Sequence, residues 1–330
     1  MSNQNITKNE IKKCNTIINK LHNYYSKRIV GQTNLERLIL ISLISNGHIL
    51  LESVPGLAKT TAAKTFTEAI NAKFGRIQCT PDLMPSDIIG TQIFNYKTNS
   101  FETKLGPIFA NLVLIDEINR SSSKTQSATL EAMQEKHITI DGVKYDLPEI
   151  FLVIATNNPI EEEGTYPLAE SQLDRFLLNI KLNYPSISEE IEILNKIENN
   201  DFEKTESPLS LDDIKYLQNI TNKVFIDETI KEYIATITNA TRNPHNYLEE
   251  KYADYIELGA SPRAAIAFLK CSKVLALLNN RTYVTPDDIK EIRHYILRHR
   301  IQLSFNALSD DITKEQIIDL IFESIQTPWN

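Results

Sequence analysis

Residues 53–60, with the sequence SVPGLAKT, combine residue types and spacing that suit a phosphate-binding loop. They follow the apolar run 49–51 and open a stretch to residue 70 that predicts a helix. In such a strand-loop-helix frame, backbone N–H groups point at phosphate oxygens and the helix N-terminus adds partial positive charge. Lys59 can then reach the β- and γ-phosphates, and the hydroxyl of Thr60 can ligate Mg²⁺.

This loop departs from the general pattern G-x-x-x-x-G-K-[ST], because Ser53 stands at the first glycine and Ala58 at the second. Gly56 lies inside the loop and can supply the positive φ that the turn needs. The alternative is a strand-to-helix turn that carries only a surface lysine. The predicted phosphate site comprises Pro55, Gly56, Leu57, Ala58, Lys59, Thr60 and Thr61.

Two acids, Asp116 and Glu117, end the apolar run 112–115. An acid at the carboxyl end of a buried parallel strand faces the crevice where ligands bind. Beside a phosphate loop, Asp116 is predicted to hold Mg²⁺ through water, and Glu117 to orient and polarise the attacking water. The alternative is a strand that ends in a solvated acidic turn, which the upstream Lys-Thr loop disfavours.

Three further polar residues follow or precede predicted elements. Asn158 ends the next apolar strand, where a neutral amide can position water; an Asn-Pro turn is the alternative. Arg175 precedes the last strand, and the alternative there is a surface pair with Asp174 that contributes little. Arg263 falls in the first turn of a helix, where the helix dipole disfavours a cation, so a ligand-related role is predicted.

Apolar strands alternate with helices in the first half of the chain. The predicted strands are 47–52, 74–79, 112–116, 150–156 and 176–182, and the predicted helices are 8–27, 32–45, 60–70 and 123–135. Continuous apolar strands suit a parallel sheet that is covered by helices on both faces. Residues 90–104 and 137–145 predict β-hairpin insertions, the second around Asp141-Gly142.

Beyond residue 185 the pattern predicts helix throughout, to residue 330. Ser210 with Asp213 resembles a capping box, and Asp227 and Thr285 stand at further helix starts. A length of 330 residues also suggests two domains. We therefore predict an α/β core at 1–185, which includes the N-terminal helices, and an all-helical domain at 186–330.

Composition excludes some classes of function. The net charge of −8 argues against broad affinity for nucleic acid or anionic membranes. The three cysteines lack metal-like spacing and suit the reducing cytoplasm. The polar stretch 1–13 does not resemble a signal peptide, and no apolar run approaches membrane-spanning length. A cytoplasmic location is therefore predicted.

One late helix carries weaker signals. Arg293, Arg298 and Arg300 could indicate nucleic acid, but a lid or a subunit interface is favoured in a protein of net charge −8. His294 and His299 are five residues apart and lie on different helix faces, which disfavours zinc.

From about residue 29 to residue 301, the chain resembles the MoxR family of AAA+ ATPases. The segments that carry the resemblance are 54–60 (VPGLAKT), 80–87 (TPDLMPSD), 106–111 (GPIFAN), 116–120 (DEINR), 124–126 (KTQ), 130–135 (LEAMQE), 163–168 (EGTYPL), 259–264 (GASPRA) and 297–301 (LRHRI). Alanine before the lysine is usual in that family, whereas Ser53 and the segment 121–123 depart from it. We expect nucleotide binding to survive both departures.

The resemblance implies an AAA+ P-loop NTPase core followed by a helical lid, with ATP and Mg²⁺ as cofactors. It implies that the segment 29–32, with Val30 and Gly31, contacts the adenine. It also implies that Glu117 is the catalytic base and that Asn158 is the first sensor. Thr60 and Asp116 would serve the metal.

The same resemblance implies roles between subunits. Arg175 would be an arginine finger that reaches the γ-phosphate of a neighbouring subunit. Arg263 would sense the γ-phosphate within its own subunit. Arg120 would be a second contact, which the resemblance supports less than it supports Arg175 and Arg263. It implies a homo-oligomer, a hexamer, that remodels or activates a client with a von Willebrand A-domain partner. The two hairpins would face the pore of the ring or the partner.

Other functions stay open from sequence. A motor acting on nucleic acid is disfavoured by the net charge and by the lack of an added DNA-binding domain. A nucleotide-dependent scaffold with little turnover can dispense with a base, so Glu117 disfavours it. A small-molecule P-loop kinase fits poorly with Arg175 and the long helical lid.

Overall fold

The computed structural model describes residues 6–54, 56–158, 164–199 and 206–329. The chain divides into two compact units. The α/β unit comprises Thr16–Gln172 and Ile180–Tyr216, and the helical unit comprises Met1–Asn15, Leu173–Asn179 and Leu217–Asn330. The units interleave in sequence, since Leu173–Asn179 joins the helical unit from between the two parts of the other. The domain boundary expected at residue 185 stays a prediction.

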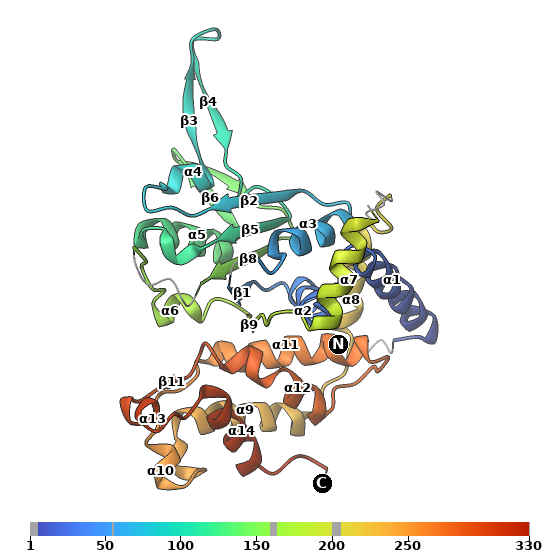
Figure 1. The fold of residues 1–330 in the computed structure, drawn as a ribbon, viewed down its shortest axis with the longest axis vertical. Coiled ribbons are helices and arrows are strands. Elements are labelled where there is room, and N and C mark those ends of the chain that lie inside the picture. The colour runs from blue at the N-terminus through green and yellow to red at the C-terminus, as the bar shows by residue number, and fades with distance from the viewer. Residues whose placement is uncertain (1–5, 55, 159–163, 200–205, 330) are drawn as a thin grey trace. The chain divides into compact units, whose positions relative to one another are not determined.

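A five-stranded sheet with the order β2-β5-β8-β1-β9 organises the α/β unit (Figure 1). Its strands are β1 (Ile49–Glu52), β2 (Phe74–Gln78), β5 (Leu112–Asp116), β8 (Leu152–Asn157) and β9 (Leu178–Lys181). The pairs β1–β8, β5–β8 and β2–β5 are parallel, and every residue of β5 is buried. The predicted class, a parallel sheet within an α/β fold, is therefore confirmed.

The predicted helices of the first half form with small shifts at their ends. Between residues 6 and 222 the helices are α1 (Lys8–Ser26), α2 (Thr33–Ile44), α3 (Lys59–Ala69), α4 (Pro85–Ile89), α5 (Ser123–Glu135), α6 (Glu170–Leu173), α7 (Ile187–Glu198) and α8 (Leu211–Asn222). Helix α3 packs on β5, so the helix that follows the phosphate loop lies over the strand that ends in Asp116. The short helices α4 and α6 were not expected, because a single turn has too few residues to show a helical period.

Both hairpin predictions are confirmed. One hairpin joins β3 (Gly90–Asn95) to β4 (Ser100–Leu105) and projects from the α/β unit (Figure 1). The other joins β6 (His137–Ile140) to β7 (Val143–Asp146). Its turn residues Asp141 and Gly142 have φ of 48° and 77°, the pair of positive values that a tight hairpin turn needs.

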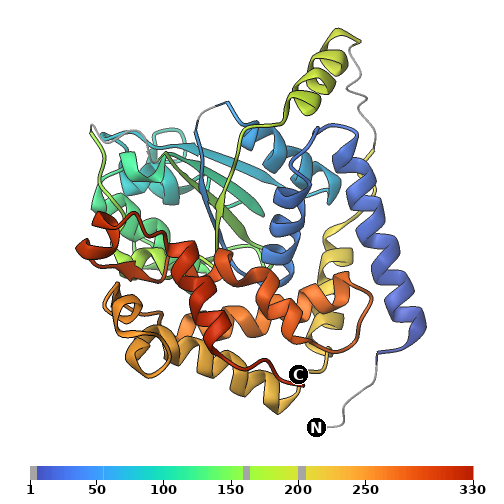
Figure 2. The same ribbon diagram turned by 60° about the horizontal axis from the view of Figure 1, so that its bottom comes forward.

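The helical unit packs longer helices against one another. Its helices after residue 222 are α9 (Glu228–Arg242), α10 (Glu250–Ala253), α11 (Pro262–Leu278), α12 (Pro286–Leu297), α13 (Phe305–Ser309) and α14 (Lys314–Ser324). Helix α11 contacts both α9 and α12, and α14 contacts α9 and α12 (Figure 2). Among the described residues, no helix is long and apolar enough to span a membrane.

The expectation that the chain is entirely helical after residue 185 is wrong at two places. The short strands β10 (Ile256–Leu258) and β11 (Gln302–Leu303) pair antiparallel. Segments of two or three residues are too short to show an alternating pattern, so they cannot be recognised from sequence.

The predicted helix starts are confirmed. Asp227 caps α9 by accepting from the Thr229 N–H at 2.9 Å. Thr285 and Asp288 form a capping box at α12. Such caps satisfy N–H groups that have no partner within the helix.

Candidate nucleotide site

The loop after β1 adopts the turns that its sequence predicts. Gly56 has φ of 88°, a left-handed value that glycine adopts without strain. Ala58 also lies in the left-handed region, with φ 52° and ψ 24°, which explains why glycine is common at this position of the general pattern. Ser53 lies outside that region, so its side chain is tolerated there. The predicted site residue Pro55 lies outside the described residues.

The first turn of α3 offers amides to an anion. Ala58, at the N-cap, makes no side-chain cap hydrogen bond, so its side chain does not cover the N–H groups that the first turn of α3 presents. The Lys59 ammonium lies nearby and donates to the Val54 carbonyl at 3.4 Å, which keeps the side chain folded back over the loop. Amides, a helix N-terminus and an ammonium together suit phosphate.

Parallel pairing brings the predicted groups to one edge of the sheet. Glu52 of β1 is in register with Asn157 of β8, and Asp116 of β5 is in register with Gln78 of β2. The Ser53 N–H donates to the Asn157 carbonyl at 3.2 Å just beyond the paired residues. The phosphate loop, the Asp116–Glu117 pair and Asn158 therefore all follow strands that end at the same edge.

Asp116 is buried with only 7% of its surface exposed, and it has a charged neighbour. Its Oδ2 accepts from the Nε of Arg76 at 2.9 Å. Cys79 lies close to the two acids. Burial raises the pKa of the Cys79 thiol to about 11, and the charges of Asp116 and Glu117 add to the shift, so the thiol stays protonated at neutral pH.

Glu117 adopts an unusual backbone conformation. Its φ of 57° and ψ of 53° are left-handed, which costs a residue with a Cβ on the order of 1 kcal/mol or more. The Glu117 N–H donates to the Thr156 hydroxyl at 2.8 Å, and this contact supports the turn. The Glu117 Oε2 accepts from the Gln78 amide at 3.0 Å and lies 3.5 Å from the Nε of Arg120.

Sequence reasoning did not identify Arg76, Gln78 or Thr156 as neighbours of the acids. A weak signal exists for the first two, because the polar residues Arg76 and Gln78 alternate with the buried Gly75 and Ile77 along β2. Alternation places both polar side chains on one face of the sheet. Arg120 contacts Glu117 of the same chain, and its role as a second contact stays a prediction.

The Val30–Gly31 turn lies against the phosphate loop. The Gln32 side chain donates to the Leu57 carbonyl at 3.4 Å. Gly31 has φ of 65°, a left-handed value that favours glycine, and the end of the Glu189 side chain lies 2.5 Å from where a Cβ would stand. These contacts connect the region expected at the adenine with the region expected at the phosphates.

In the helical unit, Asp174 is the centre of a polar cluster. It accepts from the Arg300 Nε at 2.9 Å and from the Ser261 hydroxyl at 2.7 Å, and it lies 3.5 Å from the Arg263 Nη1. Asp174 therefore pairs with these residues of the helical unit, and the alternative of a surface pair with Arg175 does not form. The buried Nε of Arg175 has no hydrogen-bond partner among the described residues.

The cationic helix α12 and its C-terminal end are neutralised by acids. Arg293 pairs with Asp319 at 2.7 Å, and Arg298 pairs with Glu315 at 2.6 Å, while Arg300 pairs with Asp174. These pairs disfavour a nucleic-acid strip at this helix. Within the described part of the chain, no group of three or more His, Cys, Asp or Glu side chains is arranged to hold a metal ion.

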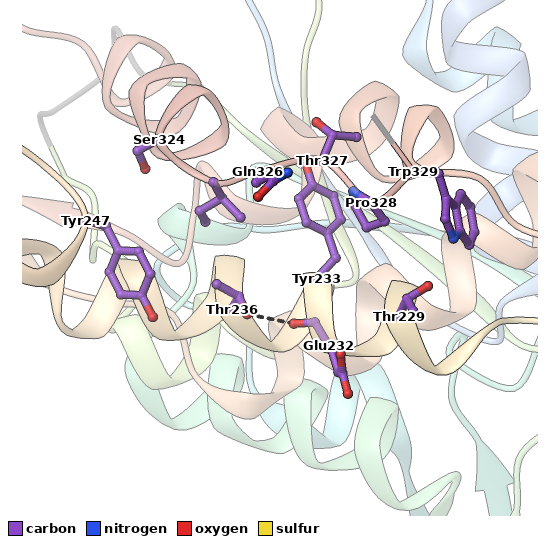
Figure 3. A pocket seen from close by; sticks show the side chains of 11 residues that line it. Thr229, Glu232, Tyr233, Thr236, Tyr247, Ser324, Gln326, Thr327, Pro328 and Trp329 are labelled. Carbon is purple, nitrogen blue, oxygen red and sulfur yellow. Dashed lines mark hydrogen bonds between the residues drawn. The ribbon is translucent and has the colours of Figure 1, made fainter.

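A hollow of about 490 Å³ in the helical unit lies between α9 and the C-terminal segment 324–329 (Figure 3). Aromatic rings of Tyr233, Tyr247 and Trp329 line it, and the Thr236 hydroxyl donates to the Glu232 carbonyl at 2.8 Å. Among the described residues, no predicted site residue lines this hollow, and none of the lining residues is a lysine or arginine that could bind phosphate.

Comparison with known families matches both parts of the chain. The family model described as "ATPase family associated with various cellular activities (AAA)" matches residues 48–178. The model described as "AAA lid domain" matches residues 249–321. The first match spans the phosphate loop, both acids and Asn158, and the second spans Arg263.

Individual relatives match over most of their length. The chain is 43% identical to Chaperone MoxR1 of Mycobacterium tuberculosis over 300 residues, which cover 91% of this chain and 79% of that protein. It is 42% identical to the protein YeaC of Bacillus subtilis over 313 residues, covering 94% and 95%. A crystal structure of a protein from Cytophaga hutchinsonii shares its fold with a TM-score of 0.92 and 44% identity, covering 97% of each chain.

Proposed function

The chain belongs to the MoxR family of AAA+ ATPases, and from that premise we propose that it is an Mg²⁺-dependent ATPase that assembles into a ring and remodels or activates a partner protein. The observation that carries this proposal is the meeting, at one sheet edge, of the α3 N-terminus with Asp116 and Glu117. An anion site beside two acids suits a nucleoside triphosphate with its metal.

Each group has a role in this proposal. Lys59 and the amides of the first α3 turn hold phosphate oxygens. The Thr60 hydroxyl and the buried Asp116 carboxylate fit Mg²⁺, which takes oxygen ligands and keeps several waters. Bound there, the metal supplies positive charge against the charge that develops on the phosphates. Glu117 orients and polarises the attacking water, and the Asn158 amide positions it without adding charge.

Two arginines complete the proposal. Arg175 reaches the γ-phosphate bound to a neighbouring subunit, and Arg263 senses the γ-phosphate of its own. In support, the contacts of Asp174 fix the segment that carries Arg175, while the buried Arg175 Nε has no hydrogen-bond partner among the described residues. An arginine supplied in trans makes hydrolysis depend on assembly, for which a ring of six is proposed.

The partner is proposed from the family. A relative with 43% identity is named Chaperone MoxR1, and that name supports the proposal that this chain acts on a client protein. A von Willebrand A-domain protein is the proposed partner, and the cytoplasm is the proposed compartment. The acid-paired arginines around α12 favour a protein client over nucleic acid.

Mixing two inactive variants tests the shared site. Arg175→Ala keeps its base and Glu117→Gln keeps its arginine, so mixed oligomers contain interfaces that pair an intact base with an intact arginine. ATP hydrolysis should return on mixing. Arg175→Ala mixed with the double variant Arg175→Ala/Glu117→Gln contains no complete interface and should stay inactive. Absence of recovery in oligomers shown to be mixed would mean that Arg175 acts within its own subunit.

Assembly is measured separately. Light scattering across a range of protein concentrations, with and without a nonhydrolysable ATP analogue, should show an oligomer that the analogue stabilises. A strict monomer under every condition would contradict the ring.

A further inference from the structure

A charged side chain already contacts the carboxylate to which the proposed function assigns the metal. The Arg76 Nε lies 2.9 Å from Asp116 Oδ2, a distance at which a charge-assisted hydrogen bond forms. Arg76 lies on β2, the edge strand next to β5, and is in register with Leu114, two residues before the acid. Its side chain therefore runs along the sheet toward the strand end.

Arg76 is placed to leave this carboxylate. Its side chain is 52% exposed, whereas that of Asp116 is 10% exposed. A second contact of Arg76 is long, from Nη2 to the Gln78 side-chain carbonyl at 3.4 Å. A half-exposed arginine on a flexible stem can turn to solvent with little loss of packing, whereas the buried Asp116 at the end of its strand cannot follow.

We infer that Arg76 is a built-in counter-ion that competes with the divalent metal for Asp116. This inference rests on the proposed function, which gives Asp116 to the metal. A guanidinium and a divalent cation on one carboxylate repel each other, so the arginine must move as the metal binds. Arg76 thereby lowers the affinity of the site for metal alone. Metal then enters mainly when nucleotide phosphates add negative charge.

The test measures metal binding without turnover. Full-length protein is titrated with Mn²⁺ both without nucleotide and with bound ADP from which unbound ADP has been removed, and the free Mn²⁺ is followed by electron paramagnetic resonance at low ionic strength. Arg76→Gln removes the charge at similar length. It should lower the half-saturating Mn²⁺ concentration about two- to fivefold, the range of a half-exposed ion pair. Arg76→Lys keeps the charge and should stay closer to the unaltered protein.

Two controls separate the possible causes. Lys73→Gln removes the same charge from the exposed residue just before β2, at the end of the strand away from Asp116, and should leave the half-saturating concentration unchanged. In the Asp116→Asn background, Arg76→Gln should have no further effect, because the shared carboxylate charge is gone.

The outcomes distinguish the inference from the proposed function. If the unaltered protein with ADP binds no Mn²⁺, or if Asp116→Asn does not weaken binding, the metal role of Asp116 is wrong. If Asp116→Asn weakens binding but Arg76→Gln leaves it unchanged, the competition is wrong and the proposed function stands. Weaker Mn²⁺ binding in Arg76→Gln would instead show that Arg76 holds the carboxylate in place for the metal.

Discussion

Asp174 and Arg300 form a buried ion pair, with Arg300 Nε 2.9 Å from Asp174 Oδ1. The Arg300 side chain is 2% exposed, and its guanidinium also donates to the carbonyl groups of Phe176 and Leu177. Burial lowers the pKa of Arg300 below its usual value, and the Asp174 charge opposes that shift. The pair thus ties the segment that carries Arg175 to the C-terminal end of α12.

Removing Arg300 should destabilise the protein strongly. Arg300→Gln leaves buried carbonyl groups and part of the Asp174 charge without their partner, so we expect a loss of about 3 kcal/mol in the free energy of unfolding. The matched control is Arg293→Gln, whose pair with Asp319 is more exposed and should cost at most about 1 kcal/mol. Urea denaturation measures both, and equal losses would contradict a structural role for the buried pair.

Replacing Glu117 should separate catalysis from binding. Glu117→Gln keeps the shape of the side chain and the phosphate contacts of Lys59, but it cannot polarise water as a carboxylate does. We expect ATP affinity to stay near that of the unaltered protein while turnover is mostly lost. Lys59→Ala should instead weaken nucleotide binding itself. Binding of a fluorescent ATP analogue and phosphate release measure the two effects, and wild-type turnover in Glu117→Gln would refute the base.

Thr156 should matter through its hydroxyl. Thr156→Val leaves the Glu117 N–H without the acceptor that lies at 2.8 Å, in a residue whose left-handed backbone needs support. The lost hydrogen bond is worth about 1 kcal/mol, so turnover should fall about fivefold with little change in nucleotide affinity. Thr156→Ser keeps the hydroxyl and should retain most of the turnover. Similar turnover in Thr156→Val and Thr156→Ser would show that the hydroxyl does not position Glu117.

Glycine at position 58 should relieve strain. Ala58 has φ of 52°, and relief of its left-handed strain offsets the greater freedom of glycine in the unfolded chain. Ala58→Gly should therefore leave the free energy of unfolding unchanged or raise it by up to about 1 kcal/mol. Ala128→Gly, the same change inside α5, should destabilise by about 1 kcal/mol. Destabilisation by Ala58→Gly in urea denaturation would show that the strain is absent.

His299 should make stability fall in mild acid. Its ring is buried and its Nε2 lies 3.0 Å from the Phe176 carbonyl, and burial moves the pKa of His299 well below 6.5. The native state keeps the ring neutral while the unfolded chain gains a proton below pH 6.5. The stabilisation is therefore complete above pH 6.5, and it is lost as pH falls below that value, by up to about 1.4 kcal/mol per pH unit.

His299→Gln cannot titrate and keeps a donor for the Phe176 carbonyl. Its free energy of unfolding should change less between pH 6.5 and 5 than that of the unaltered protein. Urea denaturation at several pH values gives both slopes. Parallel slopes would mean that His299 does not titrate differently in the two states.

Local patterns in the sequence predict much of this fold. The continuous apolar run of β5, the Asp141-Gly142 turn and the cap at Asp227 all depend on residues a few positions apart. The phosphate loop and the two acids are likewise recognisable, because each follows directly from an apolar strand. Segments such as β10 and β11 are too short to carry a period, so they were missed.

Only the tertiary structure decided which side chains meet. Gln78 contacts Glu117 and Arg76 contacts Asp116 because β2 pairs with β5 in parallel register, and neither strand alone specifies its neighbour. Asp174 pairs with Arg300, which is 126 residues away, and not with the adjacent arginine. Periodicity along a chain reports which face of an element is buried, whereas the partner of a charge depends on how distant elements pack. For that reason the sequence alone determined the chemistry of the candidate groups, and the fold decided what each of them contacts.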